Sequence, residues 1–230
     1  MNEPLPKRTL SAIVRGIWSD TCCGCGRRGS WVCERCRPTV QRLGTPACLR
    51  CGAMDLALCD CAELASELQS IRAAYPHIGW VRSAIHQFKF NGEFSRDRHL
   101  ALELVPLADY IAHDVVIPVP MHREREHLRG YNQAALLARQ LSILSGIPVD
   151  GETLIRPIKR APQVGRDRLE RRKAISGVFS IDLSAPMAVH GKRVLVVDDV
   201  ITTGATVSEC ARVLGGAGAA SVSAISIARG

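Results

Sequence analysis

The apolar and polar positions of this chain follow two different periods. Short runs rich in Val and Ile have the pattern of buried strands and cover residues 115–120, 177–183, 191–199 and 220–228. Stretches with helical spacing are longer and cover residues near 63–73, near 80–90, a segment ending before Asp114, 128–146 and 206–218. Residues 73–79 predict a short strand or turn, and residues 147–158 predict a further strand and turn. Strands and helices therefore alternate along the chain.

This alternation predicts an α/β protein with right-handed βαβ units and a mostly parallel, doubly wound sheet that carries helices on both faces. The composition agrees, because 47% of the residues are apolar and only 4% are aromatic. A core built of Ala, Val, Leu and Ile suits a parallel sheet with helical cover better than an aromatic-filled sandwich.

Three regions follow from the pattern. Residues 1–20 predict a short amphipathic lead-in, 21–62 a cysteine-rich module and 63–230 the α/β domain. No apolar run reaches the roughly 18–20 residues that span a bilayer, and the N-terminus lacks a small-residue cleavage pattern. We therefore expect a chain without a membrane span, in the cytoplasm, where thiols stay reduced.

Nine of the ten cysteines lie between Cys22 and Cys61, and eight of them form four pairs. Two pairs have the CxxCG spacing of a zinc knuckle, in which Gly lets the chain turn beneath the sulfurs. Two structural zinc sites are predicted, most simply in chain order, although an interleaved pairing or a register shift to Cys23 is also open. Disulfides, free thiols and an iron–sulfur cluster are the competing interpretations. The predicted ligands are Cys22, Cys25, Cys33 and Cys36 for one ion, and Cys48, Cys51, Cys59 and Cys61 for the other.

Such closed sites are structural, so we expect the module to need metal for folding and to have a core separate from that of the α/β domain. The formal net charge is +8, and residues 118–176 contribute 12 basic against 6 acidic residues. Within them, 159–173 hold seven basic and two acidic residues and no aromatic ring. This stretch is interpreted as a mobile hood over a phosphate ligand, as a solvated face or as a nucleic-acid contact.

The stretch from Arg193 to Leu214 carries the clearest chemistry. A buried strand ends in Asp198 and Asp199, and a helix is predicted to begin near Val207. The residues between them are suited to a phosphate cradle. Threonine hydroxyls can donate hydrogen bonds, glycine lets backbone N–H groups approach an anion closely, and the helix N-terminus adds a partial positive charge. This cradle comprises Thr202, Thr203, Gly204, Ala205 and Thr206. Two carboxylates beside a phosphate need a sugar between them, so the pattern indicates a ribose 5-phosphate, with both acids facing the sugar.

The same residues, "VLVVDDVITTGAT", resemble the phosphoribosyl diphosphate (PRPP) binding signature of type I phosphoribosyltransferases. With the cysteine module, the run Arg129-Gly130-Tyr131-Asn132-Gln133 and the closing "ISIAR", the chain resembles the ComF family of competence proteins from about Cys22 onward. That family joins a double zinc ribbon to a phosphoribosyltransferase domain. Ala161 and Ala174 depart from its pattern, where Thr and Asn are common.

The resemblance implies roles for further residues. Residues 118–129 would form a pyrophosphate loop with Arg123, Arg125 and Arg129, and Mg²⁺ would accompany PRPP. Asn132 and Gln133 alternatively cap and open a helix. The hood would carry residues that contact an acceptor or DNA, namely Gln163, Arg166, Arg168, Arg171 and Arg172.

Two functions follow. The first is transfer of a 5-phosphoribosyl group from PRPP to an unidentified acceptor, with Asp198 and Asp199 as catalytic residues and release of pyrophosphate. The second is a non-catalytic protein that senses PRPP or a nucleotide and contacts single-stranded DNA and DNA-uptake proteins, as the family name suggests. Neither the acceptor nor the oligomeric state can be read from the residues.

Overall fold

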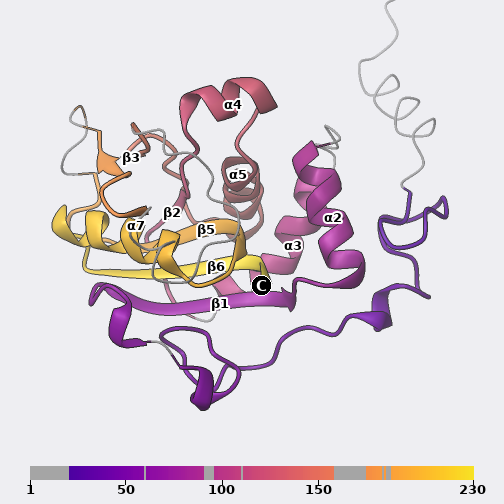
Figure 1. Ribbon diagram of the computed structural model, residues 1–230. Coiled ribbons are helices and arrows are strands. Elements are labelled where there is room, and N and C mark those ends of the chain that lie inside the picture. The colour runs from indigo at the N-terminus through magenta and orange to yellow at the C-terminus, as the bar shows by residue number, and fades with distance from the viewer. Residues whose placement is uncertain are drawn as a thin grey trace, which may run out of the picture.

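The computed structural model describes residues 21–59, 61–90, 96–109, 111–157, 175–182, 184 and 188–230. Its centre is a four-stranded sheet, in the order β1-β6-β5-β2, whose neighbouring strands are all parallel (Figure 1). The strands are β1 (Leu68–Pro76), β2 (Val115–Pro118), β5 (Arg193–Ile201) and β6 (Ser221–Arg229). The remaining pair, β3 (Leu154–Ile155) and β4 (Ser180–Ile181), is antiparallel.

Helices cover both faces of the sheet. The helices are α2 (Gly79–Phe90), α3 (Asp97–Ala108), α4 (Arg123–Arg129), α5 (Gln133–Ser145) and α7 (Ala205–Gly216). Buried side chains of α2, α3 and α5 form one apolar cluster with the sheet, and those of α7 form a second cluster with β3 and the opposite face. The predicted α/β class is confirmed. Three short 3₁₀ helices, Arg37–Thr39, Leu56–Leu58 and Cys61–Glu63, lie in the cysteine module and directly after it.

The helix predicted near 63–73 is wrong, because this segment enters strand β1. Leu68, Ile71 and Tyr75 are buried at intervals of three and four residues, which imitates helical spacing. The interval of three between Leu68 and Ile71 arises because the pairing of β1 with β6 shifts register between Leu68 and Ser70, and the interval of four up to Tyr75 is ordinary strand alternation. Such an irregularity interrupts the alternation of a strand and disguises its period.

The helix predicted over 128–146 is two helices. Gly130 adopts a positive φ of 85° and ends α4, with its backbone N–H donating to the Glu126 carbonyl. The Asn132 side chain then accepts a hydrogen bond from the backbone N–H of Ala134 and caps α5. The alternative role expected for Asn132 and Gln133, capping and opening a helix, is thus confirmed.

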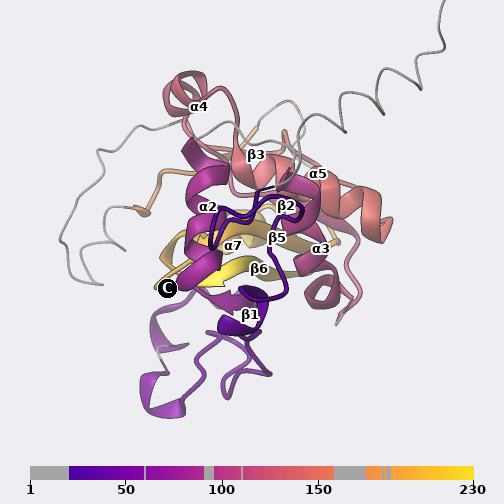
Figure 2. The same ribbon diagram turned by 90° about the vertical axis from the view of Figure 1, so that its right-hand side faces the viewer.

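The cysteine module does not have a core of its own, contrary to our expectation. Cys23, Trp31, Val32 and Val40 belong to the apolar cluster of α2 and α3, while Cys51 and Ala53 belong to the cluster of α7. Figures 1 and 2 show the module running along β1, the edge strand of the sheet. The module is too short to build a separate apolar core, so it packs on the larger domain.

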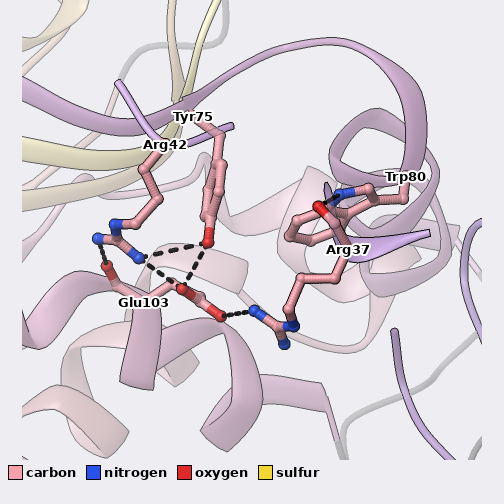
Figure 3. A network of polar contacts seen from close by, with 5 residues as sticks. All are labelled: Arg37, Arg42, Tyr75, Trp80 and Glu103. Atoms are coloured by element: carbon pink, nitrogen blue, oxygen red, sulfur yellow. Dashed lines mark hydrogen bonds and ion pairs between the residues drawn. The ribbon is translucent and has the colours of Figure 1, made fainter. Parts of the chain in front are cut away.

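A polar network fastens the module to the domain (Figure 3). The carboxylate of Glu103 on α3 accepts hydrogen bonds from Arg37 at 3.1 Å, from the Tyr75 hydroxyl at 2.8 Å and from Arg42. The Trp80 indole N–H donates to the Arg37 carbonyl at 3.3 Å. Glu103 is largely buried, so losing its partners would leave its negative charge uncompensated. These contacts therefore favour one orientation of the module on the domain.

Candidate functional site

The acid pair lies within β5, near its carboxyl end. Strand β5 continues to Ile201, beyond the end that we expected at Asp199. Strand β2, however, stops at Pro118, which pairs with Val197. Asp198 and Asp199 therefore follow directly after the last residue pair of β2 with β5, at the edge where ligands bind in open parallel sheets.

The two carboxylates begin on opposite faces of β5. Strand alternation directs Asp199 to the face of α2, where its Oδ2 lies 2.8 Å from Lys89 Nζ. Asp198 points to the face of α7, where it acts electrostatically on Cys210 and Arg156. Burial, and next the charge of Asp199, raise the pKa of Asp198 to about 7. One sugar can meet both carboxylates only by lying across the end of the strand.

The predicted phosphate cradle forms the turn between β5 and α7. Gly204 has a φ of 79° and a Cβ there would lie 2.9 Å from Ile71 Cδ1, so only glycine fits this turn without strain. Helix α7 begins at Ala205, two residues before the predicted start. The Thr203 hydroxyl accepts a hydrogen bond from the Ala205 backbone N–H at 3.3 Å. Thr202 is exposed, and Thr203 and Thr206 are half-buried.

The three arginines expected in a pyrophosphate loop lie on a short helix. Residues 123–129 form helix α4 rather than a loop, because Gly130 caps a regular turn of helix. Arg123 and Arg125 are exposed on that helix, whereas Arg129 is half-buried at its end. The Arg129 guanidinium lies 5.1 Å from the centre of the Phe90 ring, and the charge of Asp199 acts on it.

The expected hood lies outside the described residues. Residues 158–174 include every hood residue that we singled out and both departures, Ala161 and Ala174. The hairpin of β3 and β4, which flanks this segment, is described. Next to β3 a cavity of about 1050 Å³ is lined in part by Pro118, His122, Asn132, Leu154 and Arg156. Arg156 lines this cavity, and its guanidinium lies 5.5 Å from the centre of the Phe179 ring. The charge of Asp198 acts on the same guanidinium.

Sequence reasoning missed three residues beside the acid pair: Lys89, His77 and Arg156. The pattern correctly predicts a helix near 80–90, but it cannot give the direction of that helix. Figure 1 shows α2 rising at the carboxyl end of β1, which carries Lys89 to Asp199. His77 lies between β1 and α2, where burial and the charge of Lys89 lower its pKa.

The eight predicted ligands form two clusters in chain order. Within each cluster the four sulfur atoms lie within 4.8 Å of one another. The Sγ–Sγ distances include 3.2 Å for Cys48 and Cys61, 3.5 Å for Cys59 and Cys61, and 3.7 Å both for Cys25 and Cys33 and for Cys51 and Cys59. A tetrahedral zinc ion with Zn–S bonds of about 2.3 Å separates its sulfurs by about 3.8 Å. The residues therefore fit two zinc ions, and the interleaved pairing is excluded by the geometry.

The thiols outside and inside these clusters differ in environment. All ten cysteines fall within the described residues and none forms a disulfide. Cys23 lies in the apolar core beside Trp31 rather than in a cluster. The backbone N–H of Cys51 lowers the pKa of Cys48 to about 6, whereas burial and the neighbouring thiols of the same cluster raise the pKa of Cys61. Burial raises the pKa of Cys210 well above its usual value, so this thiol is a packing residue.

The donor set at the acid pair also suits magnesium. Mg²⁺ prefers one or two carboxylates together with phosphate oxygens and water, and Asp198 and Asp199 could supply the carboxylates.

Within the described residues, no helix is both long and apolar enough to cross a bilayer.

Comparisons with known proteins agree with this architecture. The phosphoribosyl transferase domain profile matches residues 127–230. Competence protein F of Haemophilus influenzae is 37% identical over 139 residues, which cover 56% of this chain and 59% of that protein. DNA utilization protein YhgH of Escherichia coli O157:H7 is 30% identical over 84% of this chain and 88% of its own length. Competence protein ComFC of Bacillus subtilis is 28% identical over 86% of this chain and 84% of its own length.

The sheet, the turn after β5 and the matched domain together define an α/β protein of the type I phosphoribosyltransferase fold, preceded by a module with two four-cysteine clusters. Within that class the chain belongs to the ComF family, whose members include the competence and DNA utilization proteins to which it is similar.

Proposed function

We propose that this protein binds PRPP and transfers its 5-phosphoribosyl group to an acceptor, releasing pyrophosphate. The observation that carries the proposal is the order of groups at the carboxyl end of β5. Two carboxylates are followed within three residues by a turn of threonines and a glycine that opens α7. Helix N-termini and turns of this kind bind phosphate, and carboxylates accept hydrogen bonds from vicinal hydroxyls.

Each group has a distinct task in this proposal. The turn 202–206 would hold the 5′-phosphate through backbone N–H groups and threonine hydroxyls. Asp199 would accept hydrogen bonds from the ribose hydroxyls and, with Asp198, would stabilise positive charge at C1′ as the C1′–O bond to pyrophosphate breaks. Mg²⁺, when bound through these carboxylates, would neutralise negative charge on the leaving pyrophosphate.

Asp199→Asn is the variant that tests catalysis. Asn keeps the size and one acceptor oxygen but removes the charge that counts most when C1′ becomes cationic. We expect pyrophosphate release to fall by about 100-fold or more and PRPP affinity to change by less than about tenfold. The measurement is a pyrophosphate-release assay across bases, nucleosides and DNA, beside calorimetry with PRPP and Mg²⁺.

A second candidate function is a non-catalytic protein that binds PRPP or a nucleotide and contacts single-stranded DNA. Similarity to the DNA utilization protein YhgH favours it, together with the basic stretch at 159–173. DNA affinity should then fall steeply with salt and survive Asp199→Asn. That result, with no pyrophosphate release for any acceptor, would replace the transferase proposal with this one.

A further inference from the structure

Lys89 lies in the last turn of α2, outside residues 127–230 that the phosphoribosyl transferase domain matches. Its Nζ lies 2.8 Å from Asp199 Oδ2, and the side chains of the two residues are 26% and 10% exposed. The lysine is therefore partly dehydrated, and its ammonium is directed at the acid pair rather than at solvent. Such a charge is costly to hold unless it is paired.

A second cation approaches the same carboxylate from α4. The Arg129 guanidinium rests against the ring of Phe90, the residue after Lys89, and donates to Gln133 Oε1 at 2.7 Å. Burial lowers the pKa of Arg129 and the charge of Asp199 opposes this shift, so the carboxylate acts on this guanidinium as well as on Lys89. Two helices thus fix two cations around one carboxylate.

Among the described residues, Lys89 and Arg129 are two cations that act on the single carboxylate of Asp199. Asp199 can neutralise one of the two cations, and the other remains held in place by an aromatic ring and an amide. A ribose diol that donates to Asp199 would take the oxygen that Lys89 now contacts. The ammonium would then be free to bind an anion that is attached to the same sugar.

We propose that Lys89, with Arg129, binds the diphosphate group of the ligand on the α2 face of the acid pair. This inference rests on the proposed function, because it assigns one part of the same ligand. Lys89 exchanges the Asp199 carboxylate for a phosphate oxygen when the sugar binds. The diphosphate therefore lies on the face of β5 that α2 covers, beside Lys89 and Arg129.

The test is calorimetry of Lys89→Met with three probes in the presence of Mg²⁺: PRPP, inorganic pyrophosphate and ribose 5-phosphate. We expect affinity for PRPP and pyrophosphate to fall by about tenfold or more, because a charge-assisted contact is lost. Affinity for ribose 5-phosphate, which lacks the diphosphate, should change by less than about threefold. A purely structural ion pair would weaken all three probes alike, and that result would overturn the inference.

Matched variants complete the design. Lys192→Met removes an exposed lysine just before β5, at the opposite end of the strand from the acid pair, and should bind all probes as the wild type does. Lys89→Arg keeps the charge and should retain pyrophosphate binding. If Lys89→Met does not fold, Arg129→Met carries the test, and wild-type pyrophosphate affinity in that variant would overturn the inference.

The outcomes separate this inference from the proposed function. PRPP binding that is equal in the wild type and Lys89→Met refutes the role of Lys89 and leaves the proposed function standing. Pyrophosphate binding that depends on Lys89, without PRPP binding, supports the diphosphate site and refutes the proposed function. A wild-type protein that binds neither PRPP nor pyrophosphate refutes both the inference and the proposed function.

Discussion

Asp198 and Asp199 are neighbours in the chain, but their side chains meet different surroundings. Asp199 contacts the ammonium of Lys89, whereas Asp198 is more strongly desolvated and interacts electrostatically with Cys210 and Arg156. The motif revealed that two acids stand together, since both are read directly from the residues. It could not reveal their partners, which come from α2 and from the segment beside β3 and depend on how these elements pack.

The raised pKa of Asp198 has a consequence for stability. Its pKa of about 7 exceeds the value of about 3.9 expected in the unfolded chain, so the folded state binds the proton more tightly. The stabilising effect of that proton is complete below about pH 4 and is lost as pH rises through 7. Asp198→Asn should therefore raise the melting temperature at pH 8 more than at pH 5.

Thermal unfolding of the ligand-free protein at both pH values measures this difference. Asp182→Asn is a suitable control, because backbone hydrogen bonds from Ser184 lower the pKa of Asp182. An equal change in melting temperature at pH 5 and pH 8 for Asp198→Asn would contradict the assignment.

At the level of elements, most strands and helices could be predicted and the errors have physical causes. Strands β2, β5 and β6 were predicted because each is buried and rich in Val, Ile or Ala. The first part of strand β1 was predicted as a helix because its register shift conceals the strand period, and only its end was predicted as a short strand or turn. The break between α4 and α5 was missed because the leucines that follow Gly130 continue a helical pattern.

Gly130 should be required for the separation of α4 from α5. Its φ of 85° is unfavourable for residues with a Cβ, and no atom lies near enough to obstruct one, so Gly130→Ala isolates backbone strain. We expect a loss of about 1–2 kcal/mol in the free energy of unfolding. Gly151→Ala also meets open space, without a positive φ, and should be neutral or slightly stabilising. Urea denaturation of both variants makes the comparison, and equal stability would argue against strain at Gly130.

The whole molecule is a single packed unit in which the cysteine module shares the apolar clusters of the α/β domain. The separation of cores that we expected from composition fails because a module of this size borrows its packing surface. Zinc should therefore stabilise more than the module. The sequence predicted the eight ligands, since paired cysteines are a local signal, but the shared core depends on long-range contacts such as those of Trp31 and Val40.

Removal of zinc should lower the stability of the phosphoribosyltransferase-like domain as well. Elemental analysis of protein purified without chelators should give two zinc ions per chain. Cys51→Ser alters a buried residue of one four-cysteine cluster and should reduce the zinc content and the melting temperature. It should also weaken PRPP binding, because Cys51 shares an apolar cluster with Leu68 and Ile71 of β1. Cys210→Ser leaves both clusters intact and should keep two zinc ions. Full PRPP affinity in metal-free protein would contradict this coupling.

The course of the module along β1 also bears on how the protein behaves when metal is scarce. The backbone N–H of Leu43 donates to Ala74 and that of Ile71 donates to Leu49, so the module occupies part of the outer edge of the sheet. An unpaired edge strand is a template on which another chain can add a strand. Zinc starvation would uncover this edge while the rest of the sheet persists. The first sign of metal shortage in a cell would then be self-association into insoluble material, before any loss of the fold.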